Sequence, residues 1–226
     1  MINCCYNAII TMQEYKQNFK YNNIDVLTLN IKFPIITMNY NPCAEWKINS
    51  QISMIVNNYI RYSAYLYDQA VNFYNDSQKN DFPFHGFEAY MEFVTTYNEN
   101  CFLSMYVDKY EFTGGAHGST IRSSVTWDLY SGMSIQLNSI FNPGIDYKFL
   151  LTKELIKQAK NNLDQNPGIY FEDYKMLIIK NFNDDSFYLT QEGLTIYYQQ
   201  YDIAPYSTGI VEFTIPYSVI NWYPTC

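Results

Sequence analysis

The sequence predicts an α+β protein, in which one or more antiparallel sheets carry a long amphipathic helix and a second helix from the C-terminal half. Three observations predict this fold class. Residues 23–38 alternate between apolar and polar, residues 48–78 repeat apolar side chains at helical spacing, and residues 89–129 form a strand-rich block with short connections. Alternation is typical of half-buried strands. Spacing of apolar residues at i, i+3 and i+4 is typical of a helix that packs on a core. Such elements combine as a sheet covered by helices.

The first predicted strand covers residues 23–38. Its alternation places Leu27 and Leu29 on one face, and Pro34 indicates an edge, a bulge or a break. Residues 1–22 are expected to be an N-terminal extension. Cys4 and Cys5 are expected to lie in a loose part of it.

The middle of the chain is predicted to pass from the helix at 48–78 into three strands. The strands cover 89–97, 101–112 and 123–129, and a probable turn at 97–100 joins the first two. Sequential strands with short connections favour an antiparallel meander.

The C-terminal part returns to helices and then strands. Asn142-Pro143-Gly144 interrupts the chain, and Asp146 is placed to cap a helix that continues to about residue 163. A shorter helix is predicted over 172–182. Three strands are then predicted, over residues 187–190, 194–198 and 210–215.

The composition excludes some functional classes. The net charge is −8 with a pI near 4.7, and the 14 basic residues are scattered, which argues against nucleic-acid binding. The acidic surface serves solubility, or attracts a basic partner. The 24 tyrosines have two explanations, an amphipathic binding surface or a coding bias toward Asn, Ile, Lys, Tyr and Phe. No apolar run is long enough to span a membrane.

The cysteines and histidines do not form a recognisable metal motif. The cysteines lack a CxxC pair, and His85 and His117 lack metal-ligand spacing, so no metal and no cofactor is expected. One disulfide is possible, for example between Cys43 and Cys101, but the sequence does not establish it. His85 is expected to be a loop or packing residue.

Catalytic motifs are also missing. There is no G-x-S-x-G elbow, and Ser119 or Cys101 with His117 is only one of many imaginable nucleophile–base pairs. The glycine loop lacks the spacing and the lysine of a phosphate cradle. The acidic pair Asp184 and Asp185 is expected to be solvated. We therefore predict a protein that is not an enzyme.

The segment from Thr113 to Thr120 is the strongest candidate for a binding site. It places Gly114, Gly115 and Gly118 around His117, between two predicted strands. Glycine permits positive φ and close backbone approach, and loops on a rigid scaffold often carry function. His117 has two compatible interpretations, a residue that braces the turn and a residue that contacts a ligand.

Two segments together resemble a known family. The first is Tyr110-Glu111-Phe112-Thr113-Gly114-Gly115-Ala116-His117-Gly118 with the following Ser124–Phe141. The second is Phe187–Leu194 with Tyr201–Gly209 and Phe213–Tyr217. Their order and spacing are similar to the RsiV-like and PdaC-associated extracytoplasmic domains. The resemblance implies a DUF4163-like half at 23–112 and a DUF3298/RsiV-like half at 113–226, expected to form one compact unit.

The resemblance also implies a function. RsiV-like domains capture lysozyme with loops, which implies contacts here by Thr113, Gly114, Gly115, His117 and Ser119. It implies further contacts by Pro205 and Tyr206, where proline fixes φ and orders an aromatic anchor. The partners would be a lysozyme-type protein or peptidoglycan, and the acidic surface suits basic hen-type lysozymes.

Alternatives to a non-catalytic binding domain remain open at this level. One is an enzyme that acts on cell-wall glycan through paired carboxylates, and another is an intracellular interaction module. The family resemblance implies an extracytoplasmic location. The N-terminus, MINCCYNAII, has no signal-peptide pattern, so the alternative is a cytoplasmic protein.

Overall fold

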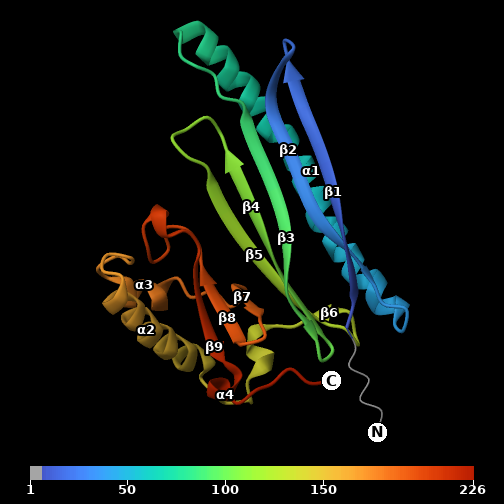
Figure 1. The fold of residues 1–226 in the computed structure, drawn as a ribbon, viewed down its shortest axis with the longest axis vertical. Helices are drawn as coiled ribbons and strands as arrows, with labels where there is room; N and C mark the ends of the chain where they lie inside the picture. Colours follow the sequence, from blue (N-terminus) through green and yellow to red (C-terminus); the bar gives the residue numbers. More distant parts are fainter. Residues whose placement is uncertain (1–6) are drawn as a thin grey trace. The chain divides into compact units, whose positions relative to one another are not determined.

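The computed structural model describes residues 7–226 and confirms the α+β class (Figure 1). One sheet has six strands in the order β1-β2-β3-β4-β5-β6, and the other has three in the order β7-β8-β9. The strands of the first sheet are β1 (Ile9–Tyr21), β2 (Ile24–Thr37), β3 (Phe87–Glu99), β4 (Phe102–Phe112), β5 (Ser119–Asp128) and β6 (Met133–Ser134). Those of the second are β7 (Phe187–Leu189), β8 (Gly193–Tyr198) and β9 (Val211–Pro216).

The helical elements lie between and after these strands. They are α1 (Pro42–Asn80), α2 (Tyr147–Gln165), α3 (Tyr174–Lys180), α4 (Tyr217–Ile220) and the short 3-10 turns η1 (Leu137–Ile140) and η2 (Tyr206–Thr208). The predicted helices at 48–78, 146–163 and 172–182 correspond to α1, α2 and α3. The second of them begins as expected, because the Asp146 carboxylate accepts a hydrogen bond from Phe149 N at 3.1 Å.

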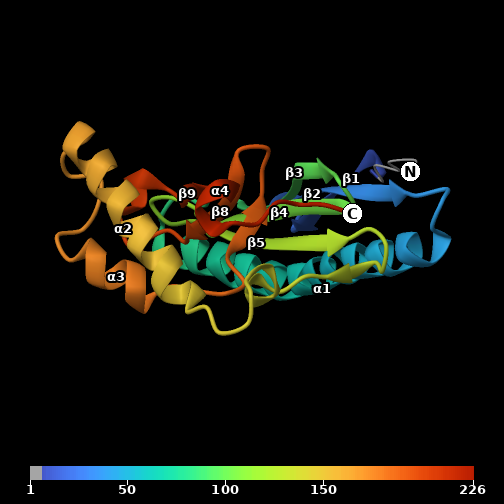
Figure 2. The same cartoon turned by 90° about the horizontal axis from the view of Figure 1, so that it is seen from below.

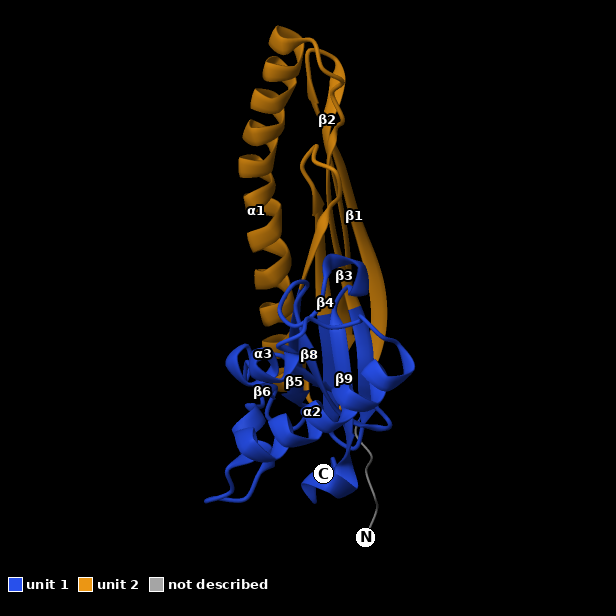
Figure 3. Ribbon diagram, turned by 90° about the vertical axis from the view of Figure 1, so that its left-hand side faces the viewer, with its two compact units in different colours: residues 1–8, 94–106, 122–226 blue, residues 9–93, 107–121 orange. Residues whose placement is uncertain are grey.

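The chain forms two compact units that alternate along the sequence (Figure 3). Of the described residues, unit 1 contains residues 7–8, 94–106 and 122–226, and unit 2 contains residues 9–93 and 107–121. The family resemblance instead implies consecutive halves that meet at residue 112/113 and are expected to form one compact unit. The difference arises because the chain passes from one unit to the other within β3, β4 and β5.

Unit 2 begins with a long hairpin that sequence periodicity did not reveal. Residues 9–21, expected as extension, form β1 and pair antiparallel with β2 along its whole length. Asn22 and Asn23 make the turn with φ of 49° and 62°, as a two-residue hairpin turn requires. No side chain of β1 is fully buried, so backbone pairing rather than deep burial defines this strand. Cys4 and Cys5 lie outside the described residues.

Helix α1 is the crossover of unit 2, and it runs along one face of β1 and β2 (Figures 2 and 3). It begins six residues before the predicted start of 48, where the Asn41 side chain caps Ala44 N at 3.2 Å. Leu27 and Leu29, which were predicted to share one face of β2, are both buried. Because α1 returns the chain to the same end of the sheet, β2 and β3 pair in parallel, which the predicted antiparallel arrangement did not include.

In unit 1, β3 and β4 are joined by the two-residue turn Asn100-Cys101, both at positive φ. Cys101 forms a disulfide with Cys226, 125 positions away in sequence. The suggested Cys43–Cys101 pairing is therefore wrong. Cys43 is exposed and is the free cysteine among residues 7–226.

The main core of unit 1 lies between the three-stranded sheet and helices α2 and α3 (Figures 1 and 2). Leu151 and Leu155 of α2 and Ile178 of α3 are fully buried against the strands. On β9, Val211, Phe213 and Ile215 alternate with more exposed residues and are buried. This core holds the second segment of the predicted binding site in place.

Candidate functional site

The first predicted site segment, residues 113–118, connects β4 to β5 in unit 2. Thr113, Gly115 and His117 are exposed, as is Ser119 at the start of β5, whereas Gly118 is buried. The loop therefore presents side chains on both sides of a buried glycine. Whether these residues bind a partner stays a prediction.

Two glycines of the loop are explained by close packing. Gly114 has a φ of +82°, and a Cβ at this position would lie 2.4 Å from Phe73 Cε1 of α1. A Cβ at Gly118 would lie 2.3 Å from Tyr110 Cε2 of β4. At Gly115 the nearest atom is 4.0 Å away. Gly114 and Gly118 thus hold the loop against aromatic rings, whereas Gly115 has room for a side chain.

The position of His117 is compatible with both roles that the sequence left open, bracing the turn and contacting a ligand. Its Nδ1 lies 2.9 Å from the carbonyl oxygen of Gly118, so the ring braces the turn. The side chain is also exposed, so it is accessible to a ligand.

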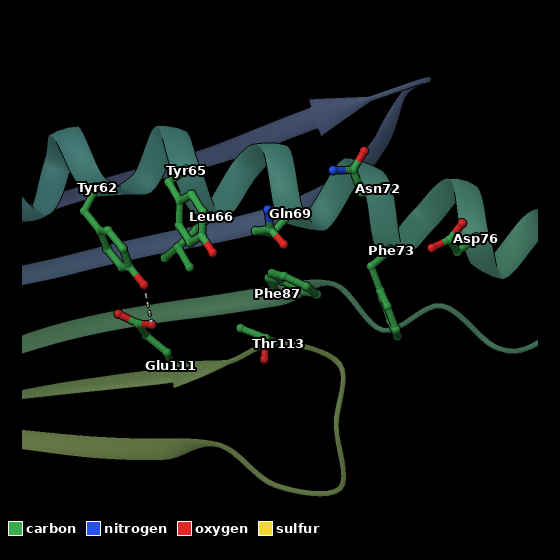
Figure 4. Close-up of a pocket in the computed structure, with 10 residues that line it drawn as sticks. All are labelled: Tyr62, Tyr65, Leu66, Gln69, Asn72, Phe73, Asp76, Phe87, Glu111 and Thr113. Atoms are coloured by element: carbon green, nitrogen blue, oxygen red, sulfur yellow. Dashed lines mark hydrogen bonds between the residues drawn. The ribbon is translucent and has the colours of Figure 1, made fainter.

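A groove of about 440 Å³ lies beside this loop, within unit 2 (Figure 4). One wall is a stripe of α1, the other is the end of β4, and Thr113 links the groove to the loop. The lining residues are Tyr62, Tyr65, Leu66, Gln69, Asn72, Phe73, Asp76, Phe87, Glu111 and Thr113. The groove is within the size range of small-ligand pockets.

Three tyrosines on α1 form a ladder that leads into the groove. Tyr59 stacks on Tyr62 with ring centroids 6.1 Å apart, and Tyr62 on Tyr65 at 5.6 Å. The Tyr62 hydroxyl donates to Glu111 Oε2 at 3.3 Å and so joins the two walls (Figure 4). Burial, together with the negative charge of Glu111, raises the pKa of Tyr59 and Tyr62, which keeps both phenols protonated.

Of the groove residues, Glu111 and Thr113 belong to the motif found in the sequence, whereas the residues on α1 were not predicted to bind. Tyr62, Tyr65, Gln69 and Asp76 are spaced by three, four and seven residues on the exposed side of α1. Residues with this spacing share one helix face, but in the sequence they cannot be distinguished from an ordinary solvated surface. The fold places Glu111 opposite them and so forms the groove.

The second predicted segment lies in unit 1, after β8. Pro205 has φ −62° and ψ 161°, and it precedes η2, which begins at Tyr206. Tyr206 is half-buried, and its ring centroid lies 5.9 Å from that of Tyr201. The neighbouring Ala204 is buried in the core, and Thr208 Oγ1 donates to Ile169 O at 3.0 Å. The segment is therefore held in one conformation.

The two predicted segments belong to different units, the first to unit 2 and the second to unit 1. The structure also gives the positions and partners of the other residues that the sequence offered as candidates for chemistry. His85 is exposed in the loop before β3, and Cys101 is in the disulfide. Asp184 is not merely solvated, because it accepts a hydrogen bond from the Tyr147 hydroxyl at 3.1 Å and pairs with Lys148.

Across residues 7–226, no group of three or more His, Cys, Asp or Glu side chains is placed so that it could hold a metal ion. Nor does any helix within that range have the length and apolar character needed to cross a membrane.

Comparison with known proteins gives two family matches. Residues 20–120 match the model of the deacetylase PdaC, and residues 138–218 match the model of a protein family of unknown function, DUF3298. The anti-sigma-V factor RsiV of Bacillus subtilis (strain 168) is 25% identical over 220 residues, which cover 94% of this chain and 69% of that protein.

Solved structures show the same fold. A DUF3298 family member from Bacteroides fragilis NCTC 9343 superposes with a TM-score of 0.73 at 21% identity, covering 96% of this chain and 94% of that chain. A DUF3298 family protein from Pseudomonas aeruginosa PAO1 has a TM-score of 0.61 at 22% identity, with coverage of 95% and 92%. The matches together confirm the predicted resemblance to an RsiV/PdaC-like domain.

Proposed function

We propose that this RsiV/PdaC-like domain is a non-catalytic extracytoplasmic binding domain whose ligand is a lysozyme-type muramidase. The observation that carries the proposal is the match to the anti-sigma-V factor RsiV over 94% of the chain. RsiV-like proteins capture lysozyme with loops, and the corresponding loops here are residues 113–119 and 204–209. Their positions on folded scaffolds are compatible with binding to a preformed partner.

The disulfide supports the extracytoplasmic location. Disulfides form and persist in oxidising compartments and are rare in the reducing cytoplasm. The Cys101–Cys226 bond ties the turn after β3 to the last residue of the chain. A cytoplasmic protein would gain nothing from this pairing, because its thiols would stay reduced.

The charge of the chain supports a basic partner. A net charge of −8 attracts a basic protein and speeds its association. Hen-type lysozymes are basic, so the proposal requires that added salt slows association. Tyr206 is the expected aromatic anchor, since a half-buried ring next to Pro205 loses little freedom on binding.

The test is calorimetric titration of the purified protein with a C-type lysozyme. Tyr206→Ala and His117→Ala are each expected to weaken binding about tenfold or more, because aromatic anchors carry a large share of binding energy. Tyr130→Ala is the matched control, since Tyr130 is 78% exposed outside both loops. Absence of binding by the wild type, or equal loss in the control, contradicts the proposal.

One observation favours a second candidate, an enzyme that acts on cell-wall glycan. Asp76 and Glu111 line the same groove, and glycoside hydrolysis uses two carboxylates that face each other across a cleft. Incubating purified peptidoglycan with the wild type and with Glu111→Gln separates the two functions. Release of reducing ends by the wild type but not by the variant would replace the binding proposal with the enzymatic one.

A further inference from the structure

We propose that the groove of unit 2 is a saccharide site that takes a short oligomer of uncharged or amino-bearing pyranose rings. The groove lies between α1 and β4, and of its lining residues the lysozyme proposal uses Thr113 alone (Figure 4). The proposal rests on four features of the groove, namely its apolar floor, its aromatic rings, its polar rim and the sign of its charge.

The floor and the rim have different chemistry. Leu66 and Phe87 are buried, and Phe73 is half-buried at the bottom of the groove. Gln69 and Asn72 are exposed above them, each with an amide that both donates and accepts. A pyranose ring has an apolar C–H face and a hydroxyl edge, so this combination of floor and rim suits it on both sides.

The tyrosines supply a flat surface of the required kind. Tyr62 is 40% exposed and Tyr65 is 56% exposed, although both are large aromatic residues. The face of an aromatic ring is electron-rich and attracts the weakly positive C–H groups of a sugar. Because Tyr65 stacks on Tyr62, its ring is already oriented before a ligand arrives.

The charge of the rim decides which sugars are accepted. Asp76 and Glu111 line the groove, and its lining contains no Lys or Arg. Lys109, the next inward-facing residue of β4, lies over the Tyr59 ring at 5.8 Å instead. Carboxylates accept hydrogen bonds from hydroxyl and ammonium groups but repel anions, so acidic sugars are disfavoured.

The walls are held at a fixed separation. The hydrogen bond from Tyr62 to Glu111 joins them at one end, and the packing of Phe73 on Gly114 joins them at the other. A site that is formed before binding loses less entropy when it is occupied. The groove is therefore a preorganised site rather than a gap that closes on a ligand.

The experiment is a titration of the whole chain with three trisaccharides, made of N-acetylglucosamine, glucosamine and galacturonic acid. The first two are expected to bind and the third is not. Tyr65→Ala and Gln69→Ala are each expected to weaken binding about tenfold. Tyr130→Ala is the control for the loss of an exposed tyrosine, and circular dichroism establishes that each variant is folded. Glu111→Gln is expected to weaken glucosamine binding more than N-acetylglucosamine binding.

The outcomes distinguish this proposal from the lysozyme proposal. Tyr65→Ala should leave lysozyme binding unchanged, and Tyr206→Ala should leave trisaccharide binding unchanged. The saccharide site is overturned if no trisaccharide binds the wild type at concentrations of about 10 mM. It is also overturned if folded Tyr65→Ala and Gln69→Ala bind as the wild type does, or if the acidic trisaccharide binds best.

Discussion

Arg122 is one of two arginines in the chain, and it is the buried one. Its guanidinium lies 3.6 Å from the Tyr106 ring centroid and pairs with Glu212. Gln199 accepts from the Arg122 backbone N–H at 2.9 Å and donates to its carbonyl at 2.7 Å. The residue therefore combines stacking, an ion pair and backbone hydrogen bonds within unit 1.

We expect Arg122→Lys to lower the free energy of unfolding by about 2 kcal/mol, because an ammonium cannot stack on Tyr106 as a planar guanidinium does. Urea unfolding measures the change. Arg61→Lys is the matched control, since Arg61 is exposed on α1. Equal midpoints for the two variants would show that the stacked geometry contributes nothing.

The stability of the protein is expected to depend on pH through Asp202. Burial raises its pKa above the ordinary 3.8, although the hydrogen bond from Gln199 N at 2.8 Å opposes the shift. The folded protein therefore holds this proton more tightly than the unfolded chain does. Its contribution to stability is fully present below pH 3.8 and is lost as the pH rises through the raised pKa.

We expect the wild type to lose stability relative to Asp202→Asn as the pH rises from about 3 to 7, because asparagine accepts the same hydrogen bond without a buried charge. Melting temperatures across this range measure the difference. Asp164→Asn, which changes an exposed residue, is the control. The prediction is contradicted if the melting temperature of the wild type increases relative to that of Asp202→Asn as the pH rises.

The loop between β4 and β5 contains glycines at which an added side chain would meet a neighbouring aromatic ring. Gly118→Ala is expected to destabilise the protein by about 1–3 kcal/mol, because the added methyl group meets the Tyr110 ring. Gly115→Ala is the natural comparison, since its Cβ has room. Thermal unfolding of both variants measures the difference.

If both alanine variants unfold at the wild-type temperature, close packing does not explain Gly118. The same pair also informs the binding proposal. A variant that is stable but no longer binds lysozyme would assign the loop a direct role, and Gly115→Ala is the better variant for this purpose.

At the scale of the whole molecule, the disulfide closes a loop of 125 positions between Cys101 and Cys226. Closing a loop of this length restricts the unfolded chain and is worth up to about 5 kcal/mol in the chain-entropy model. We expect Cys226→Ser to lower the melting temperature under non-reducing conditions. Cys43→Ser is the control, because Cys43 is free and exposed.

A reducing agent should bring the wild type to the melting temperature of Cys226→Ser and leave that variant unchanged. If the wild type melts at the same temperature with and without the reducing agent, the pairing makes no contribution. The disulfide would then no longer support an oxidising compartment.

Features that depend on neighbouring residues could be predicted from the amino-acid sequence. Periodicity located α1, α2 and β2, the cap at Asp146 located a helix start, and paired motifs located the RsiV/PdaC-like resemblance. Each of these signals is local, since it comes from the 3.6- or 2-residue repeat or from a side chain that bonds the backbone three residues on. The exposed loop at 113–118 was found in the same way.

Features that join residues far apart in the sequence became visible in the folded chain. β1 is a strand because its backbone pairs with β2, although none of its side chains is fully buried. The partner of Cys101 lies at the end of the chain, and the groove combines α1 with Glu111. These contacts depend on how the chain returns to itself over tens of residues, and no local pattern of side chains encodes that path.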